Sequence, residues 1–261
     1  MRTMHFDYRM RLNFDTQVSK HRFTVRAFPQ SDEMQRVLRL QYEIMPNCFL
    51  ADSMDGFGNR IVYGYAEEPH DCFAIHVSGE VRTGSSAALT SPEPWKLGMF
   101  RQTQGLTAAG EGIHQLERQL SGDADALSFA RQIMDYLNEH FNYQPGVTHA
   151  KTTAEQALQS GAGVCQDYAH IMLALLRLRR VACRYVVGLM AGEGKSHAWV
   201  DVHTGNAWVS LDPTNHRAVD DSYIRFSAGR DADDCAINLG RFTGFANQTS
   251  TISAIVSETD G

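Results

Sequence analysis

Apolar and polar residues alternate along the start of the chain. Every second residue of this run is apolar, namely Phe6, Tyr8, Met10, Leu12 and Phe14. The residues between them are charged or polar, so the run has a period of two. This period is typical of a β-strand that buries one face.

The same pattern returns in the segments 23–27 and 38–44, and further strands are expected at 61–65 and 73–77. The sequence Asp-Gly-Phe-Gly-Asn at 55–59 is typical of a turn between strands. Several short strands separated by turns predict a small β-sandwich, which we expect over residues 1–85.

The pattern then changes. Residues 86–110 are rich in Gly, Ser, Thr and Pro, and we expect a linker there. Beyond it, steps of three and four residues between Leu127, Ala130, Met134 and Leu137 predict an amphipathic helix.

Two more helices and three strands are expected after this helix. Thr152 to Glu155 fits a capping box that starts the second helix, and the third runs from Cys165 to Arg180. The strands follow at 184–189, 197–202 and 207–211. Helices followed by an antiparallel sheet predict an α+β domain over residues 111–261.

Composition narrows the class of protein. The 261 residues are 43% hydrophobic and 21% charged, which is ordinary for a globular protein. The net charge of −6 argues against a nucleic-acid partner, because such proteins need clustered positive charge. No apolar run is long enough for a membrane span or resembles a signal peptide, so we expect no membrane partner and a cytoplasmic location.

Five cysteines are present, and none forms a CxxC pair that would indicate a zinc or redox site. Cys165 stands where Ser-Gly-Ala-Gly at 160–163 gives way to the third helix. Unpaired N–H groups at a helix N-terminus favour a thiolate, and they can also hold the oxyanion that forms when a carbonyl is attacked. Cys165 is therefore a candidate nucleophile.

His197 and Asp212 lie on neighbouring expected strands joined by a hairpin. A turn at Thr204-Gly205 pairs His197 directly with Asp212, at a Cβ separation of about 4.5–5.5 Å. A turn at Gly205-Asn206 makes Asp212 a diagonal neighbour on the same face, at about 7–8 Å. Either register keeps the imidazole near the carboxylate, as a base and the residue that orients it require.

Other potential partners are less well placed. Asp201 lies about 13 Å from His197 along the same strand. His170 is carried about 7.5 Å along the third helix from Cys165 and onto another face, and His203 lies at the far end of the hairpin. Arg177, with its neighbours Arg179 and Arg180, is expected at a solvated helix end.

The residues quoted next resemble a known family. They are Gly-Ala-Gly-Val-Cys-Gln-Asp-Tyr-Ala-His at 161–170, Cys-Arg-Tyr-Val-Val-Gly at 183–188, His-Ala-Trp-Val-Asp at 197–201 and Leu-Asp-Pro-Thr-Asn at 211–215. Together they resemble the transglutaminase-like superfamily, and its bacterial branch most. The strand-rich start resembles the N-terminal domain of that branch, and Ala-Gly-Arg-Asp at 228–231 resembles its C-terminal signature. The resemblance implies a papain-like α+β catalytic domain with Cys165, His197 and Asp212 as its triad.

The implied reaction is acyl transfer through a thioester. Cys165 attacks the carbonyl of an amide in a protein or peptide substrate, and water or an amine then takes the acyl group. A peptidase or amidase that uses only water, and a binding protein without turnover, remain alternatives. No cofactor is expected, and the positive field of the helix N-terminus argues against a metal ion at the cysteine.

Overall fold

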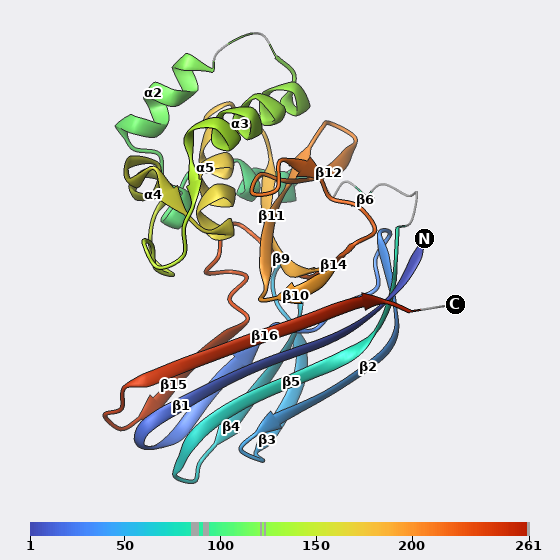
Figure 1. Ribbon diagram of the computed structural model, residues 1–261, viewed down its shortest axis with the longest axis vertical. Coiled ribbons are helices and arrows are strands. Elements are labelled where there is room, and N and C mark those ends of the chain that lie inside the picture. The colour runs from blue at the N-terminus through green and yellow to red at the C-terminus, as the bar shows by residue number, and fades with distance from the viewer. Residues whose placement is uncertain (85–88, 91–93, 121, 123, 260–261) are drawn as a thin grey trace.

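The computed structural model describes residues 1–84, 89–90, 94–120, 122 and 124–259. It has a strand-rich domain at one end and a helical domain with its own sheet at the other (Figure 1). This arrangement confirms the expected α+β class with an N-terminal β domain.

The β domain is built around one long strand, β1 (Arg2–Val25). Its apolar residues are buried in alternation, as the period of two predicted. The strand crosses from one sheet to the other at an irregularity between Asn13 and Val18. The other strands of the domain are β2 (Gln35–Met45), β3 (Phe49–Met54), β4 (Arg60–Ala66), β5 (His70–Thr83), β15 (Asn238–Thr243) and β16 (Gln248–Glu258).

The two sheets share β1. Its first half lies between β5 and β16, and β2 pairs with the far edge of β5. Its second half lies between β4 and β15, and β3 pairs with the far edge of β4. Through β1 the strands form one continuous sheet, and the apolar residues of β1 are buried in the main core.

The last strands of the chain lie in the β domain. β15 and β16 hydrogen-bond to β1, whereas the expected division placed them in the helical domain at 111–261. No strand was expected at 238–243 or 248–258, and even a recognised strand would not reveal its partner, because periodicity does not report pairing.

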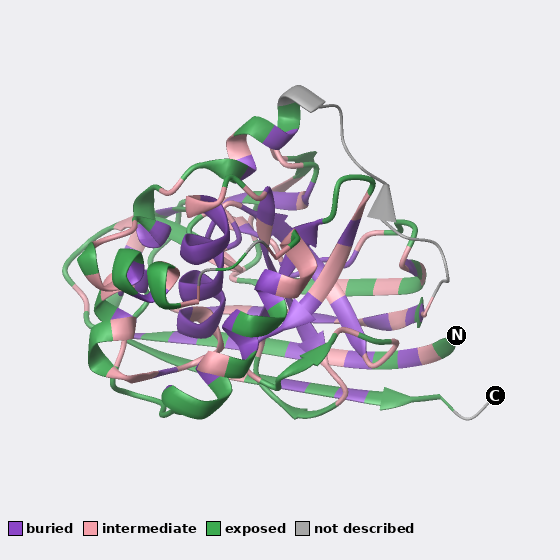
Figure 2. Ribbon diagram, turned by 90° about the horizontal axis from the view of Figure 1, so that it is seen from above, coloured by how far each residue is buried: buried purple, intermediate pink, exposed green. Residues whose placement is uncertain are grey.

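The helical domain surrounds α5 (Cys165–Leu178), which is buried along most of its length (Figure 2). Three helices pack near it, namely α2 (Glu111–Gln119), α3 (Ala126–His140) and α4 (Ala154–Ser160). Beside α5 lies an antiparallel sheet of β9 (Cys183–Met190), β11 (His197–His203), β12 (Ala207–Asp212), β13 (Arg217–Ala218) and β14 (Tyr223–Gly229).

Local sequence explains where the helices begin. The carboxylate of Asp125 accepts hydrogen bonds from the backbone N–H groups of Leu127 and Ser128 and so caps α3. The capping box of α4 joins Thr153 and Gln156, one residue later than expected.

The segment expected to be a linker at 86–110 packs against the helical domain. Residues 85–88 and 91–93 of this segment lie outside the described part of the chain. The remainder forms β6 (Leu89–Thr90), α1 (Pro94–Leu97) and two 3₁₀ turns, Gly98–Arg101 and Gly105–Thr107. Phe100 is buried, with its ring 5.8 Å from that of Trp208, so this part of the connection is integrated into the core.

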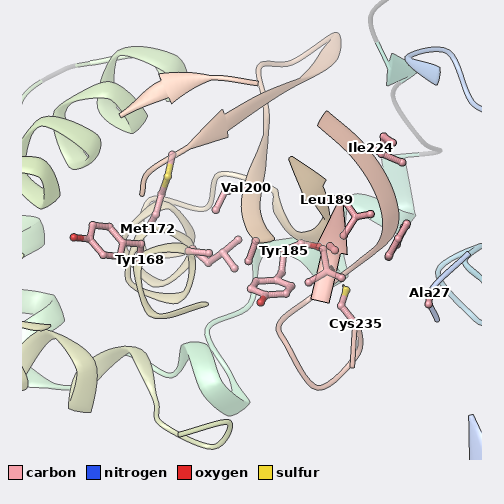
Figure 3. Close-up of a cluster of buried hydrophobic side chains, with 14 of the residues drawn as sticks. Ala27, Tyr168, Met172, Tyr185, Leu189, Val200, Ile224 and Cys235 are labelled. Atoms are coloured by element: carbon pink, nitrogen blue, oxygen red, sulfur yellow. Dashed lines mark hydrogen bonds between the residues drawn. The ribbon is translucent and has the colours of Figure 1, made fainter. Parts of the chain in front are cut away.

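One apolar core runs through both domains. Around α5 and β9 it includes Tyr168, Met172 and Leu189 (Figure 3). Phe226 on β14 contacts the β domain, since its ring centroid lies 6.0 Å from that of Phe6 and 5.8 Å from that of Tyr8. The two domains therefore share buried surface.

Candidate active site

Cys165 is the first residue of α5 and is half-buried. The two-residue strand β8 (Ala162–Gly163) leads to it and pairs with β7 (Asn142–Tyr143). Gly163 must be glycine here, because a Cβ at this position would lie 2.5 Å from Oδ2 of Asp167 and 2.7 Å from its Cβ. The chain can approach the start of α5 this closely only without a side chain.

Asp167 holds the first turn of this helix in place. Its Oδ2 accepts hydrogen bonds from the backbone N–H of Val164 at 2.8 Å and from the hydroxyl of Thr148 at 2.7 Å. Burial raises the pKa of Asp167, although these two hydrogen bonds act in the opposite direction. Asp167 therefore joins the loop between β7 and α4 to the turn that leads to Cys165.

His197 begins β11 and Asp212 ends β12. The hairpin pairs His203 with Trp208 and Val200 with Leu211, which corresponds to the turn at Gly205-Asn206. Asp212 is thus the diagonal neighbour of His197, the second of the two expected registers. Nε2 of His197 lies 2.7 Å from Oδ2 of Asp212, and the Asp212 side chain is fully buried.

Cys165 interacts with the same imidazole. Burial alone lowers the pKa of His197, but hydrogen bonds with Asp212 and Cys165, together with their negative charges, raise it to about 10. The structure therefore brings together the three residues that the sequence singled out.

Asp212 has further hydrogen-bond donors. Its Oδ2 also accepts from the hydroxyl of Tyr223 at 2.7 Å and from the amide of Asn215 at 2.7 Å. Its Oδ1 accepts from the backbone N–H groups of Thr214 and Asn215. Burial raises the pKa of Asp212, but the bond with His197 and these other donors outweigh it and hold the pKa below its usual value.

Tyr223 was missed by the sequence analysis. It lies on β14, on the far side of β9 from β11, so no hairpin argument connects it to Asp212. Arg217 donates a hydrogen bond to the Tyr223 hydroxyl at 3.0 Å. The Tyr223 ring packs edge-on against Trp199, with ring centroids 5.4 Å apart. Trp199 is 1% exposed, and its ring stacks on the imidazole of His197 with centroids 6.4 Å apart.

The competing residues have other partners. Asp201 is fully buried and pairs with Arg184 at 2.6 Å and Arg225 at 2.9 Å. His170 is fully buried and accepts a hydrogen bond from the backbone N–H of Ala232. His203 packs edge-on against Trp208 at the other end of the hairpin.

The expectation that Arg177 is solvated is wrong. Its side chain is 2% exposed and donates to the carbonyl oxygens of Phe100, Cys183 and Arg230. The guanidinium is buried because the segment expected to be a linker folds over this end of α5.

Within the described residues, no group of three or more His, Cys, Asp or Glu side chains is arranged to hold a metal ion. None of the described helices combines the length and the apolar character needed to cross a membrane.

Comparison with known proteins places the chain in a family. Residues 114–213 match the transglutaminase-like superfamily, and residues 4–82 match the bacterial transglutaminase-like N-terminal region. An uncharacterized protein of Mycobacterium tuberculosis is 30% identical over 216 residues, which cover 70% of this chain and 68% of that protein. An uncharacterized protein of Mycobacterium leprae is 26% identical over 239 residues, covering 84% and 85% of the two chains.

A solved structure shares the whole fold. The crystal structure of a candidate cysteine protease from Cytophaga hutchinsonii aligns over 100% of this chain and 92% of its own, with a TM-score of 0.79 and 21% identity. Both domains are thus found together in a known structure. By the two family matches and the mycobacterial relative, this chain belongs to the transglutaminase-like superfamily and carries the bacterial form of its N-terminal domain.

Proposed function

We propose that this protein is a cysteine enzyme that transfers the acyl group of an amide substrate through a thioester on Cys165. The observation that carries this proposal is the chain of contacts from Cys165 through His197 to Asp212, in which the pKa of His197 is raised to about 10. The imidazole of His197, oriented by Asp212, is the base that accepts the thiol proton of Cys165. A thiolate is the nucleophilic form of cysteine.

The position of Cys165 supports the first chemical step. The thiolate attacks the carbonyl carbon of a peptide or glutamine-type amide, and the carbonyl oxygen takes the negative charge. The N–H groups of Cys165 and Gln166 occupy the first two positions of α5 and have no acceptor within the helix. They are suited to bind the oxyanion, aided by the helix dipole.

The imidazolium then acts as a general acid. His197 gives its proton to the leaving amine, the carbon–nitrogen bond breaks, and a thioester remains on Cys165. Water or a second amine attacks this thioester while neutral His197 accepts its proton. The acyl group leaves on the acceptor, and the thiolate–imidazolium pair is restored. Asp212 keeps the imidazole oriented through both steps.

The reactivity of the cysteines tests the nucleophile. We expect Cys165 to be alkylated by iodoacetamide at pH 7 faster than the other four cysteines, as followed by mass spectrometry of the peptides. Burial raises the pKa of Cys183 to about 11 and also raises the pKa of Cys235 and Cys48. Equal rates for all five thiols would contradict the assignment. The Cys165→Ser variant should lose the fast-reacting thiol, whereas the matched control Cys72→Ser should keep it.

The acceptor is tested with a glutamine-containing peptide and a labelled primary amine. Incorporation of the amine identifies a transferase, whereas release of the free acid alone identifies an amidase or peptidase. Cys165→Ala should lower either rate by about 10⁴-fold while the circular dichroism spectrum is unchanged. A folded wild-type protein that forms no thioester with a peptide library would instead indicate a binding protein and would refute the proposal.

A further inference from the structure

The outer face of the second sheet of the β domain is hollowed into a groove. Its volume is about 660 Å³, within the range of ligand sites in proteins. The groove lies on strands β3, β4, β1 and β15, at the end of the molecule away from the helices (Figure 1). We call it the β-domain groove. The side chains that matter for what it can bind are those of Lys20, Arg22, Phe49, Tyr63, Tyr65, Leu239 and Arg241.

Strand register arranges these side chains in cross-strand rows. In one row, Phe49 pairs with Tyr65, Tyr65 with Arg22, and Arg22 with Arg241. Paired residues on adjacent strands project from the same face of a sheet. The row therefore runs from an aromatic end on β3 and β4 to a cationic end on β1 and β15.

The apolar side of the groove is open to solvent. Phe49 is 71% exposed, Tyr63 is 49% exposed and Leu239 is 59% exposed. Large apolar side chains gathered in one exposed depression are typical of a binding surface, whereas single exposed ones are common everywhere.

The cations of the groove are not neutralised by the protein. Among the described residues, the side chains of Lys20, Arg22 and Arg241 form no hydrogen bond and no ion pair. The guanidinium of Arg22 lies over the ring of Tyr65, 5.3 Å from its centroid, which keeps it on this face. None of the described lining residues is acidic, although the chain as a whole carries a net charge of −6.

We propose that the β-domain groove binds an acidic polypeptide segment that carries an aromatic or aliphatic side chain. The carboxylates lie against Arg22, Arg241 and Lys20, and the apolar side chain packs between Phe49, Tyr63 and Tyr65. Four strands spaced by about 4.8 Å make a face about 14 Å wide, which matches roughly four extended residues. This proposal goes beyond the catalytic one and does not depend on it.

A polypeptide fits the charge of the site better than a nucleic acid. Nucleic acids present a dense row of phosphates and are bound through extended basic surfaces. Here three cations stand on a protein of net charge −6, so a long polyanion meets repulsion beyond the groove. A short segment with two or three carboxylates matches the groove without extending past it.

The test uses the Cys165→Ala variant of the 261-residue chain, so that binding is measured without turnover. The probe is the unlabelled peptide Gly-Phe-Glu-Tyr-Glu-Asp-Gly, titrated into ¹⁵N-labelled protein and followed by NMR. We expect amide shifts at Arg22, Tyr65 and Leu239, and an affinity that weakens as salt is added. The double variant Arg22→Glu with Arg241→Glu should bind about tenfold more weakly or worse.

The matched control is Arg36→Glu with Arg39→Glu, on the exposed side of β2, which changes the net charge by the same amount. It should leave the affinity unchanged, and a peptide with Gln and Asn in place of Glu and Asp should fail to bind. Equal binding to both double variants, or shifts confined to residues outside the groove, would refute the proposal. Tighter binding of a thymidine hexanucleotide than of the peptide would also overturn it, in favour of a nucleic-acid site.

Discussion

At the scale of single residues, Asp212 is the side chain of the candidate site that is held by the most hydrogen bonds. Its carboxylate is fully buried and accepts hydrogen bonds on both oxygens, from His197, Tyr223, Asn215 and the backbone. A buried charge is tolerated only when it is compensated in this way. The donors other than His197 therefore determine how firmly the imidazole is oriented.

Replacing Tyr223 with Phe removes one of these donors and keeps the ring against Trp199. We expect the variant to be about 1–3 kcal/mol less stable than the wild type in urea unfolding at pH 7. The donors hold the pKa of Asp212 below its unfolded value, so their stabilisation is present above that value and is lost as pH falls through the folded pKa. The difference in the free energy of unfolding between variant and wild type should therefore become smaller in acid.

Tyr63→Phe is the matched control for this variant, because the Tyr63 side chain is exposed. It should leave the stability unchanged at every pH. An equal stability gap for Tyr223→Phe at pH 7 and in acid would show that the lost hydroxyl acts through packing and not through the carboxylate.

At the scale of elements, the start of α5 is shaped by what lies beside it. β8 approaches the helix so closely that Asp167 occupies the space where a side chain of residue 163 would stand. Asp167 in turn holds Val164 and Thr148. The position of Cys165 thus depends on a glycine and an aspartate that never touch a substrate in the proposed mechanism.

Gly163→Ala tests this dependence. The new methyl group overlaps the carboxyl and Cβ of Asp167, so the first turn of α5 must shift, at a cost of about 1–3 kcal/mol. We expect the alkylation rate of Cys165 to fall together with the stability. Gly56→Ala is the control, because a Cβ there has nothing within 4 Å and the backbone is not left-handed. Unchanged alkylation and stability in Gly163→Ala would mean that the helix start absorbs the methyl group.

At the scale of the whole molecule, the β domain is joined to the sheet of the helical domain through side-chain amides. Asn59 donates to the carbonyl of Ala228 at 2.9 Å and accepts from its N–H at 2.8 Å, and Gln35 bonds in the same way to Arg225. Both amides therefore pair with backbone N–H and C=O groups at the outer edge of β14. In addition, β10 (Gly192–Gly194), just before His197, pairs with β16 of the β domain.

Removing the side-chain amide of Asn59 should destabilise the interface between the two domains. We expect Asn59→Ala to lose about 1–3 kcal/mol of stability, because the peptide group of Ala228 stays buried without its partners. Urea unfolding followed by circular dichroism measures this loss, with the exposed Asn13→Ala as control. Equal stabilities of the two variants would show that the apolar contacts alone join the domains.

Sequence reasoning succeeded where the signal is local. The alternation in β1, the helix that starts at Cys165 and the hairpin that carries His197 and Asp212 all follow from spacing and turn chemistry. The capping box at Thr153 was misplaced by one residue, since neighbouring threonines offer the same hydroxyl. The choice between the two hairpin registers needed coordinates, because both turns have favourable chemistry.

The sequence by itself determined the strands with a clear alternation, such as β1 and β5, the three best-marked helices and the pairing of a histidine with an aspartate on one hairpin, because each of these depends on residues near one another along the chain. Tertiary structure alone decided that Cys165 meets His197, that Tyr223 supports Asp212 and that Arg177 is buried. It also decided that the last two strands complete the first domain. These contacts join segments far apart in the chain, and no local period or turn records which distant surfaces pack together.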